Sequence, residues 1–407
     1  MNRVKAVAGN AGPKVRSDCE MTLELKQKGG ISIDLASKVK ALYGESILKQ
    51  CNEILKFFGI RNAYLSVNDS GALPFVISAR LEAAIRKLVD NDLEYIPEML
   101  GVNRYSTARD RFRFSRLYLP GNNPGLMLNA GLHSADGIIL DLEDSVAPDR
   151  KDEARILVRN ALCQVDFMGA ERMVRINQGE TGLLDLRAVI PMNVNLVLIP
   201  KCDSPEEVIG VDEEISAIRK NLKIRNPVYL MPIIESASGV ENSSAIARAS
   251  ENIVAMAIGL EDLTADMGVM RSREGKESFY SRSRLVIAAK AAGIQPIDSV
   301  FSDVADMEGL RLNVLDSRAM GFEGMGCIHP RQIAVINEGF APGEAELEKS
   351  MKIVIAFEEA RKKGQGVVAL GSKMIDKPVV ERARKTIDLA IKLRRLSAGW
   401  MNDSSID

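Results

Sequence analysis

Two patterns of apolar and polar positions divide the chain. In the first, residues 21–28 (MTLELKQK) alternate apolar and polar side chains, which predicts a half-buried strand. A Gly29-Gly30 turn and the strand-like ISIDL follow. Apolar residues then recur at helical spacing from Val39 to Phe58, and again in VISARLEAAIRKLV after the strand-like AYLSV. We therefore expect a small α+β domain over residues 1–92.

The second pattern follows a polar segment, residues 93–111, which carries no sustained periodicity and is predicted to be a linker. From residue 112, short apolar runs alternate with amphipathic stretches such as DEARILVRNAL, which is typical of parallel strands buried between helices. The runs are LYLP (117–120), GIILDL (137–142), RMVRI (172–176), LVLIP (196–200), VYLMPII (228–234), IVAMAIG (253–259), QPIDSV (295–300) and GMGCIH (324–329). Eight such units are the number that a (β/α)8 TIM barrel requires, and no glycine-rich phosphate loop favours an open doubly wound sheet instead. We predict an α/β fold with its barrel over residues 112–343.

Residues 344–407 lie beyond the eight barrel units. They carry two long charged helical patterns separated by QGVVALGSKMIDKPVV. We expect a C-terminal helical extension, which is suited to packing on a neighbouring subunit.

Composition and charge narrow the class of protein. The chain has 407 residues, of which 46% are hydrophobic and 27% charged, as in globular proteins of more than one domain. Its formal net charge of −1 gives no electrostatic reason to expect nucleic acid. No apolar run is long enough for a membrane span or a signal peptide. Five scattered cysteines argue against a disulfide framework, so we expect a cytoplasmic protein without membrane or nucleic-acid partners.

The predicted barrel places one set of residues together, because its strands end at a common face where active sites form. Nearly every run is followed by polar or charged residues: Gly121-Asn122, Glu143 with Asp144, Arg175 with Asn177, Lys201, Glu235, Glu261 with Asp262, Asp298 and His329. Loops are polar in any protein, but polar or charged residues at the ends of so many strands favour a shared site. With only two histidines in the chain, a metal here would be a hard cation held by carboxylates. Glu235 and Asp262 can supply such ligands for Mg²⁺, and Arg175 can pair with a substrate carboxylate.

Several of these residues also have a structural interpretation. Glu143 and Asp144 can cap the following helix, a role compatible with a catalytic one. Lys201 fits a salt bridge at the barrel rim, and His329 fits a hydrogen bond there. Glu261 is expected to point to the face opposite Asp262, and Asp298 is left open.

The motifs RLYLPGNNPG, ADGIILDLEDSVAPDRKDEAR, VRIN, LIPK, IIESASGV, GLEDLTADMG, SFYSRSR and KMIDKPVVERARK closely resemble the citrate lyase β subunit and its malyl- and citramalyl-thioester lyase relatives, over residues 112–390. The resemblance implies a magnesium-dependent TIM barrel that assembles as a homo-oligomer, a trimer or a multiple of one. It implies these roles: metal ligation by Glu235 and Asp262, substrate carboxylate and oxyanion contact by Arg175, retention of metal-bound water by Glu143 and Asp144, and acid–base chemistry by Asp376 from an adjacent subunit. One departure is Met325, where the citrate lyase subunits carry a lysine.

The N-terminal stretches VAGNAGPKVRSD, SKVKALYGESI and NDSGALPFVISARLEAAIRK resemble the small acyl carrier protein (γ subunit) of citrate lyase. In that family a serine bears a phosphoribosyl-dephospho-CoA arm. An alignment without a gap places Arg16 at the attachment position, with Ser17 one place later. Two interpretations stay open: Ser17 carries the arm, or the domain has lost it and is structural.

The function that the resemblance implies is cleavage of a 3-hydroxy-3-carboxyacyl thioester, with citryl thioester giving oxaloacetate and acetyl thioester. A citrate lyase α (acyl-transfer) subunit would then be a partner. One alternative is a malyl-CoA or citramalyl-CoA lyase or thioesterase with a degenerate carrier domain. Another is a catalytically silent scaffold, which the presence of Glu235, Asp262, Arg175 and Asp376 disfavours.

Overall fold

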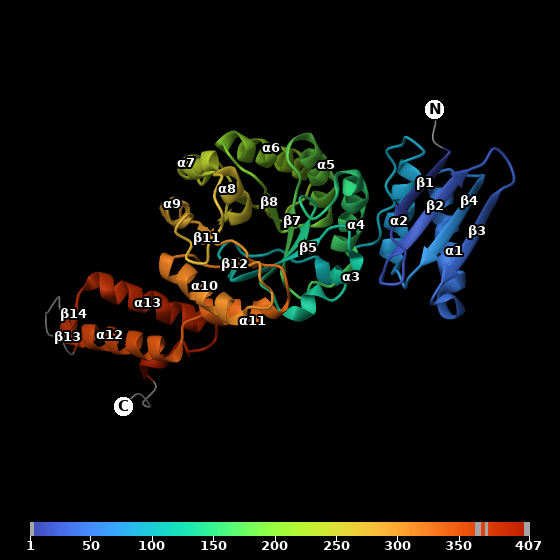
Figure 1. Ribbon diagram of the computed structural model, residues 1–407. Helices are drawn as coiled ribbons and strands as arrows, with labels where there is room; N and C mark the ends of the chain where they lie inside the picture. The colour runs from blue at the N-terminus through green and yellow to red at the C-terminus, as the bar shows by residue number, and fades with distance from the viewer. Residues whose placement is uncertain (1–3, 363–367, 371–372, 403–407) are drawn as a thin grey trace.

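The computed structural model describes residues 4–362, 368–370 and 373–402, and Figure 1 shows three parts that follow one another along the chain. The first part is a four-stranded sheet of order β1-β2-β4-β3, in which only β3 and β4 run parallel. Its elements are β1 (Lys5–Gly9), β2 (Cys19–Leu25), β3 (Ile31–Ser37), α1 (Lys40–Phe57), β4 (Ala63–Asp69) and α2 (Pro74–Arg86). The alternating strands and both helices predicted here are present.

The second part is an eight-stranded parallel sheet with the order β11-β10-β9-β8-β7-β6-β5-β12. Its strands coincide with the eight apolar runs: β5 (Ser115–Pro120), β6 (Gly137–Asp141), β7 (Glu171–Arg175), β8 (Leu196–Ile199), β9 (Tyr229–Ile234), β10 (Ala255–Ile258), β11 (Gln295–Ile297) and β12 (Met325–Cys327). A parallel bridge between Asp298 and Met325 joins β11 to β12 and closes the sheet on itself. The predicted TIM-barrel fold is thereby confirmed.

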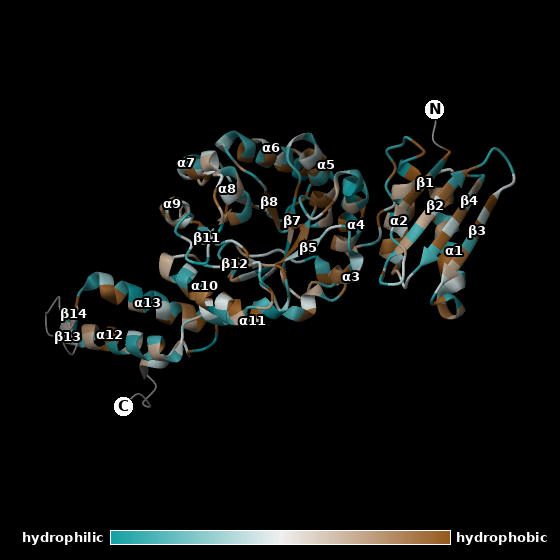
Figure 2. Cartoon of the chain, viewed as in Figure 1, coloured by the Kyte–Doolittle hydropathy of each residue, from teal (hydrophilic) through white to brown (hydrophobic). Residues whose placement is uncertain are grey.

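Helices surround this barrel on its outer side (Figure 1). They are α3 (Pro124–Met127), α4 (Lys151–Gln164), α5 (Gly179–Val189), α6 (Pro205–Leu222), α7 (Ala237–Ile246), α8 (Leu260–Asp266), α9 (Phe279–Ala292), α10 (Met307–Met320) and α11 (Arg331–Phe340). Successive strand residues alternate between two cores: one cluster fills the barrel interior, and a larger one lies between strands and helices. Figure 2 shows the strands as predominantly hydrophobic and the outer helices as mixed.

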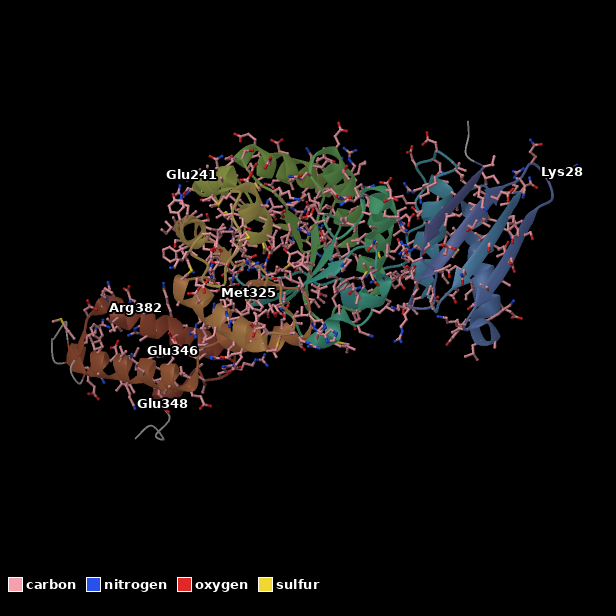
Figure 3. All side chains as sticks on the ribbon, viewed as in Figure 1. Lys28, Glu241, Met325, Glu346, Glu348 and Arg382 are labelled. Carbon is pink, nitrogen blue, oxygen red and sulfur yellow. The ribbon has the colours of Figure 1, made fainter. Side chains whose placement is uncertain are left out.

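Met325, where the resemblance to the citrate lyase β subunit implies a lysine, lies in the barrel part of the chain (Figure 3). Its side chain is fully buried and belongs to the cluster between strands and helices. A lysine there would place an ammonium in an apolar layer unless a partner accompanied it. Methionine suits the surroundings that this chain provides.

The third part is a helical extension beyond α11. It contains α12 (Glu344–Lys362), a hairpin of β13 (Val368–Leu370) and β14 (Lys373–Ile375), and α13 (Lys377–Lys392). The two helices pack on each other around a separate apolar cluster that includes Met351, Val354, Val380 and Ile387. The predicted pair of helices is present, although the second one already begins at Lys377, within the segment expected to separate them. Among the residues with described structure, no helix combines the length and apolarity that a membrane span needs.

The polar segment over residues 93–111 is bound along the barrel rather than detached from it. Asn103 donates from its side chain to the carbonyl oxygen of Val165 at 2.7 Å, and Thr107 donates to Glu171 at 2.8 Å. The buried guanidinium of Arg172 lies over the Tyr105 ring and donates to the Tyr105 carbonyl. The segment lacks apolar periodicity because its contacts to the barrel are largely polar.

The N-terminal domain is joined to the barrel through α2 and α4. Every residue of α2 from Phe75 to Ile85 is buried, because this helix lies between its own sheet and α4. Arg159 of α4 donates two hydrogen bonds to Glu82 of α2, at 2.9 and 2.7 Å, and both side chains are almost completely buried. Glu153 of α4 in turn accepts from Lys87 and lies 3.7 Å from Arg80.

We predict that Glu82→Ala destabilises the protein strongly, by roughly 3–5 kcal/mol, because Arg159 loses its buried partner and keeps only the exposed Glu94 at 3.2 Å. Urea unfolding followed by circular dichroism measures the change. The double variant with Arg159→Met should recover most of the loss, since it removes the uncompensated charge. Glu308→Ala, which breaks an exposed pair with Arg311, is the matched control and should leave the midpoint unchanged. A Glu82→Ala protein as stable as this control would contradict the prediction.

Candidate active site

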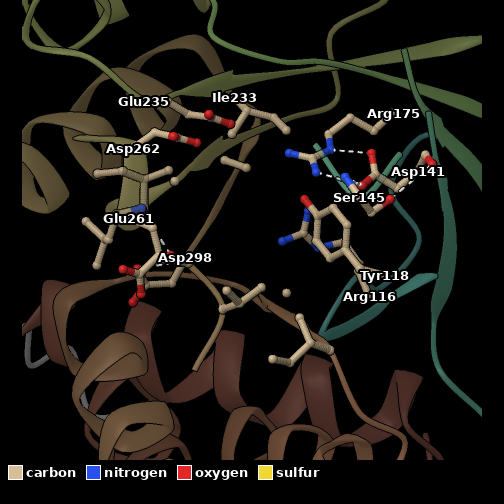
Figure 4. Close-up of a pocket in the computed structure, with 18 of the residues that line it drawn as sticks. Arg116, Tyr118, Asp141, Ser145, Arg175, Ile233, Glu235, Glu261, Asp262 and Asp298 are labelled. Atoms are coloured by element: carbon tan, nitrogen blue, oxygen red, sulfur yellow. Dashed lines mark hydrogen bonds and ion pairs between the residues drawn. The ribbon is translucent and has the colours of Figure 1, made fainter. Parts of the chain in front are cut away.

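A cavity of about 360 Å³ opens at the carboxyl ends of the barrel strands (Figure 4). Seven of the eight strands or the loops that follow them contribute to its wall. The predicted residues Arg175, Glu235, Glu261, Asp262 and Asp298 all line it. The barrel therefore brings together residues that are separated by up to 123 positions in the sequence.

Glu235 and Asp262 form a pair of facing carboxylates on one side of this cavity (Figure 4). Glu235 follows β9 and is only 4% exposed, while Asp262 lies in the first turn of α8. Gly259, which precedes α8, leaves space for the Glu235 side chain, because a Cβ at this position would lie 2.7 Å from the Glu235 Cγ. Burial, together with the hydrogen bond and charge of Asp262, raises the pKa of Glu235 to about 9.

This pair has the properties of a site for a hard divalent cation. The Glu235 Oε2 atom is buried and has no hydrogen-bond partner in the described part of the chain. Two ionised carboxylates that face each other in a buried site repel each other unless a cation lies between them. No cluster of three or more acidic, histidine or cysteine ligands occurs among the residues that the structure describes. The protein therefore supplies two oxygen ligands, a set that suits Mg²⁺ because it retains several waters.

Arg175 lies across the cavity from this pair and is fixed by Asp141 at the end of β6. Its Nε and Nη2 atoms donate to the two Asp141 oxygens at 2.7 and 2.8 Å, and its Nη1 lies 3.0 Å from Glu143. Burial alone would raise the pKa of Asp141, but the hydrogen bonds and charge of Arg175 bring it below its ordinary value. A guanidinium has five N–H donors, and these contacts use three of them. Two donors are left for a bound molecule.

Glu143 and Asp144 belong to an ion-pair group at the rim. Lys201 donates to Glu143 at 2.8 Å and to Asp144 at 3.1 Å, which is the rim salt bridge expected for this lysine. The helix-capping interpretation of the two acids is wrong. The α4 helix begins at Lys151, and the residue before it provides no side-chain cap.

Three further strand-end residues are held by structural contacts. Asp298 is buried in an ion pair with Arg282, at 2.6 Å, and forms part of the cavity wall. The backbone N–H of Arg331 donates to His329 Nδ1 at 3.2 Å, as expected for a rim residue. The orientation expected for Glu261 is wrong: its carboxylate pairs with Arg271, and the residue lines the same cavity as Asp262.

Asn177 and Gly121-Asn122 are structural as well. The Asn177 backbone and side chain both donate to Asp185 of α5. The Asn122 carbonyl accepts from Arg80 of the N-terminal domain at 2.8 Å. A Cβ at Gly121 would lie 2.6 Å from the Asp141 carbonyl oxygen, so this position requires glycine.

Asp376 and Ser17 lie outside the cavity of their own chain. Asp376 precedes α13, a helix that lies in the C-terminal extension apart from the barrel strands (Figure 1), and the described residues that line the cavity do not include it. Its side chain accepts from the Val379 N–H at 3.3 Å. Ser17 is half-buried with φ of +58°, and its N–H donates to Ser70. A Cβ at Gly125 of α3 would lie 3.1 Å from the Arg16 carbonyl, so this loop borders the strand-end face of the barrel.

Sequence reasoning missed several residues of the cavity, among them Asp141, Arg116 and Tyr118. Asp141 is the one acid inside the apolar run GIILDL, and that position was its only signal. Tyr118 lies within LYLP, and Arg116 immediately precedes it. All three alternate with core residues on β5 or β6, so the pattern identified the strands but not the side chains that face the cavity.

Comparisons with known proteins agree with this geometry. Residues 115–330 match the model of the family described as HpcH/HpaI aldolase/citrate lyase, and residues 5–88 match that of the malonate decarboxylase delta subunit (MdcD), an acyl-carrier-protein family. The citrate lyase subunit beta of Leuconostoc mesenteroides is 37% identical over 286 residues, covering 69% of this chain and 94% of that protein. Human mitochondrial citramalyl-CoA lyase is 33% identical, covering 77% of this chain and 95% of that protein.

A solved structure supports the same assignment. CitE from Mycobacterium tuberculosis, in complex with magnesium, acetoacetate and coenzyme A, aligns with a TM-score of 0.58 at 30% identity and covers 70% of this chain and 99% of that one. Fold and site thus define a carbon–carbon lyase built on a TIM barrel. The chain belongs to the HpcH/HpaI aldolase/citrate lyase family and carries an additional N-terminal domain of the acyl-carrier type.

The raised pKa of Glu235 predicts a measurable dependence of stability on pH. Without a cation, the folded protein keeps a proton on Glu235 that the unfolded chain loses above its ordinary pKa of 4.5, so stability falls as the pH rises from there towards about 9. We predict that Glu235→Gln raises the melting temperature at pH 8 in a chelator. The difference should vanish near pH 4.5, and Mg²⁺ should stabilise only the wild type.

Glu213→Gln, on the exposed side of α6, is the matched control and should melt like the wild type at both pH values. A Glu235→Gln protein that melts below the wild type in chelator at pH 8 would contradict the assignment of a strained carboxylate pair. So would Mg²⁺ stabilisation that survives the substitution.

Proposed function

We propose that this protein is a magnesium-dependent lyase that cleaves a 3-hydroxy-3-carboxyacyl thioester, with citryl thioester as the substrate and oxaloacetate and acetyl thioester as products. The observation that carries the proposal is the facing pair of Glu235 and Asp262, which lies across one cavity from Arg175 (Figure 4). The relative whose structure contains magnesium, acetoacetate and coenzyme A supports the class of ligand. Glu235 and Asp262 are the proposed metal ligands.

The chain's own residues account for the main requirements of this cleavage. A divalent cation at the carboxylate pair would polarise the substrate hydroxyl and carboxylate oxygens. Arg175 has two free donors, enough to hold a substrate carboxylate or the oxygen of the departing enolate. Asp141 and Glu143 keep that guanidinium in position, so no reorganisation is needed when charge develops. Glu143 and Asp144, fixed by Lys201, are proposed to hold water near the cation.

Proton return to carbon needs a general acid, and the resemblance to the citrate lyase β subunit implies that Asp376 is this acid. Asp376 is exposed on the C-terminal extension and is the proposed donor, delivered by a neighbouring subunit of a homo-oligomer. The same carboxylate caps α13, which fixes its orientation. Both roles can coexist, because the capping bond occupies one carboxylate oxygen.

For the N-terminal domain we propose Ser17 as the attachment residue for a phosphoribosyl-dephospho-CoA arm, with an acyl-transfer α subunit as partner. Its hydroxyl can form a phosphodiester, whereas the Arg16 side chain cannot. Its loop borders the strand-end face of the barrel. Intact-mass measurement of natively expressed protein distinguishes this from a domain that has lost the arm. In that second case citramalyl-CoA or malyl-CoA becomes the alternative substrate.

The lyase proposal is tested with citryl-, citramalyl- and malyl-CoA, with Mg²⁺ or with a chelator. We expect Mg²⁺-dependent release of a 2-oxo acid, and we expect Arg175→Lys to reduce kcat/KM by at least about 100-fold, because an ammonium cannot reproduce the planar fork. Arg187→Lys, in an exposed pair with Glu214, is the control and should keep full activity. Cleavage that is unaffected by the chelator would refute the metal role, and a mild Arg175→Lys effect would make this arginine structural.

The shared site is tested by mixing two inactive variants, Asp376→Asn and Glu235→Gln. In mixed oligomers some interfaces combine an intact carboxylate pair with an intact Asp376, so activity should return partially. A site within one chain allows no rescue, because each chain carries one lesion. Absence of rescue under conditions that demonstrably exchange subunits would refute delivery of Asp376 from a neighbour.

A further inference from the structure

Arg116 is a fully buried guanidinium in the interior of the barrel. It is the second residue of β5, where interior-facing positions alternate with residues of the outer core, and Tyr118 and Pro120 follow it on the same side. Its register partners on the two neighbouring strands are both glycines, Gly137 and Gly326. The absence of side chains on either side leaves room for its long stem.

The guanidinium of Arg116 has no oxygen acceptor among the described residues. Its Nη1 donates to the Met231 sulfur, a weak acceptor, on the non-adjacent strand β9, and its buried Nε has no partner. Other fully buried arginines differ: Arg113 pairs with Glu171, and Arg159 with Glu82. Arg80 and Arg172 likewise donate to oxygen atoms.

A buried cation without an anion is unfavourable by itself. Burial lowers the pKa of Arg116 only to about 10, so the group is charged at neutral pH. It contacts Met231 of the apolar barrel cluster, and Ile233 and Ala257 of that cluster line the same cavity as Arg116. The side that is open leads into the active-site cavity, which Arg116 lines. The described residues provide no counter-ion for Arg116, and a molecule bound in that cavity can supply one.

Arg116 also differs from Arg175 in what it can bind. Asp141 and Glu143 already neutralise Arg175, whereas no ion pair to Arg116 occurs in the part of the chain that the structure describes. In Figure 4, Arg116, Tyr118 and Arg175 lie on one side of the cavity and Glu235 and Asp262 on the other. Arg116 lies four residues before the end of β5, so it forms the floor. A substrate group that projects below the reacting carbon is the part that meets it.

We propose that Arg116 binds a second substrate carboxylate and thereby selects an acyl group with two free carboxylates. This inference rests on the proposed lyase function and specifies its substrate. The candidate acyl groups differ in one substituent on the hydroxyl-bearing carbon: a carboxymethyl group in citryl, a methyl group in citramalyl and a hydrogen in malyl thioesters. Only the carboxymethyl group carries the additional charge that complements Arg116. The product would be a four-carbon 2-oxo dicarboxylate.

The experiment compares Arg116→Met, which keeps the length and removes the charge, with the wild type on citryl-CoA and citramalyl-CoA. We expect kcat/KM for citryl-CoA to fall roughly 10- to 100-fold, as for a lost hydrogen bond to a charged group. Citramalyl-CoA turnover should stay within about threefold of the wild type or improve, since its methyl group makes no use of the charge. An equal loss for both thioesters would overturn the proposal, and so would a wild type that prefers citramalyl-CoA.

Ligand binding provides a second measurement that does not depend on turnover. Oxaloacetate should raise the melting temperature of the wild type in Mg²⁺ more than pyruvate does, and Arg116→Met should remove this difference. In the absence of ligands, Arg116→Met should melt at or above the wild-type temperature, because it removes a buried charge that lacks an ion-pair partner. Removal of an arginine with a structural role would lower the melting temperature instead. If Arg116→Met does not fold, equal shifts of the wild type by both acids overturn the proposal, and a larger oxaloacetate shift supports it.

The two hypotheses fail in different ways. If none of the thioesters is cleaved, the lyase function is wrong, and a preference for oxaloacetate that Arg116→Met removes would still support the role of Arg116. If all are cleaved with similar kcat/KM by both proteins, the lyase function stands and the role of Arg116 does not.

Discussion

Negative charge that is buried at the strand ends is the constraint on which the site depends. The carboxylates of Asp141, Glu235 and Asp262 line one small cavity, and Glu143 lies beside Arg175 at its rim. The protein neutralises half of this charge itself, through Arg175 and Lys201. Glu235 and Asp262 have no such cationic partner among the described residues, so without a metal ion the raised pKa of Glu235 keeps a proton on this pair. The two sides of the cavity therefore differ. The side of Arg175 is already fixed by ion pairs, whereas the side of Glu235 and Asp262 needs a cation.

The charges at the interface of the N-terminal domain are, by contrast, paired with each other. Its interface with the barrel uses buried ion pairs that are internally complete, such as Glu82 with Arg159, so nothing further is needed to stabilise it. The polar segment over residues 93–111 is likewise hydrogen-bonded along its course. An acyl-carrier-like domain that is connected by a free tether would need neither feature. Here the carrier-like domain and the barrel form one body.

How much of this could be read from the sequence depended on the physical origin of each signal. Parallel strands buried on both faces give continuous apolar runs, so all eight were found, and their ends identified Arg175, Glu235 and Asp262. Asp141 and Arg116 were missed because a charged residue at the edge of an apolar run has the same local pattern whether it faces a cavity or a helix. The orientation of Glu261 depends on Arg271 in a later loop, which no local periodicity predicts.

The interface between α2 and α4, which buried ion pairs hold together, affects how far a carried acyl group could move. If Ser17 bears an arm, the attachment point is fixed relative to the barrel, and the reach of the acyl group depends on the length of the arm alone. Each barrel has one such attachment point, so the covalent chain fixes the ratio of carrier domain to catalytic centre at one to one. The effective concentration of the acyl group at its own barrel would then be insensitive to the length of residues 93–111, unlike that of modules joined by flexible linkers. Exchange with other subunits would require them to come within the radius of that arm.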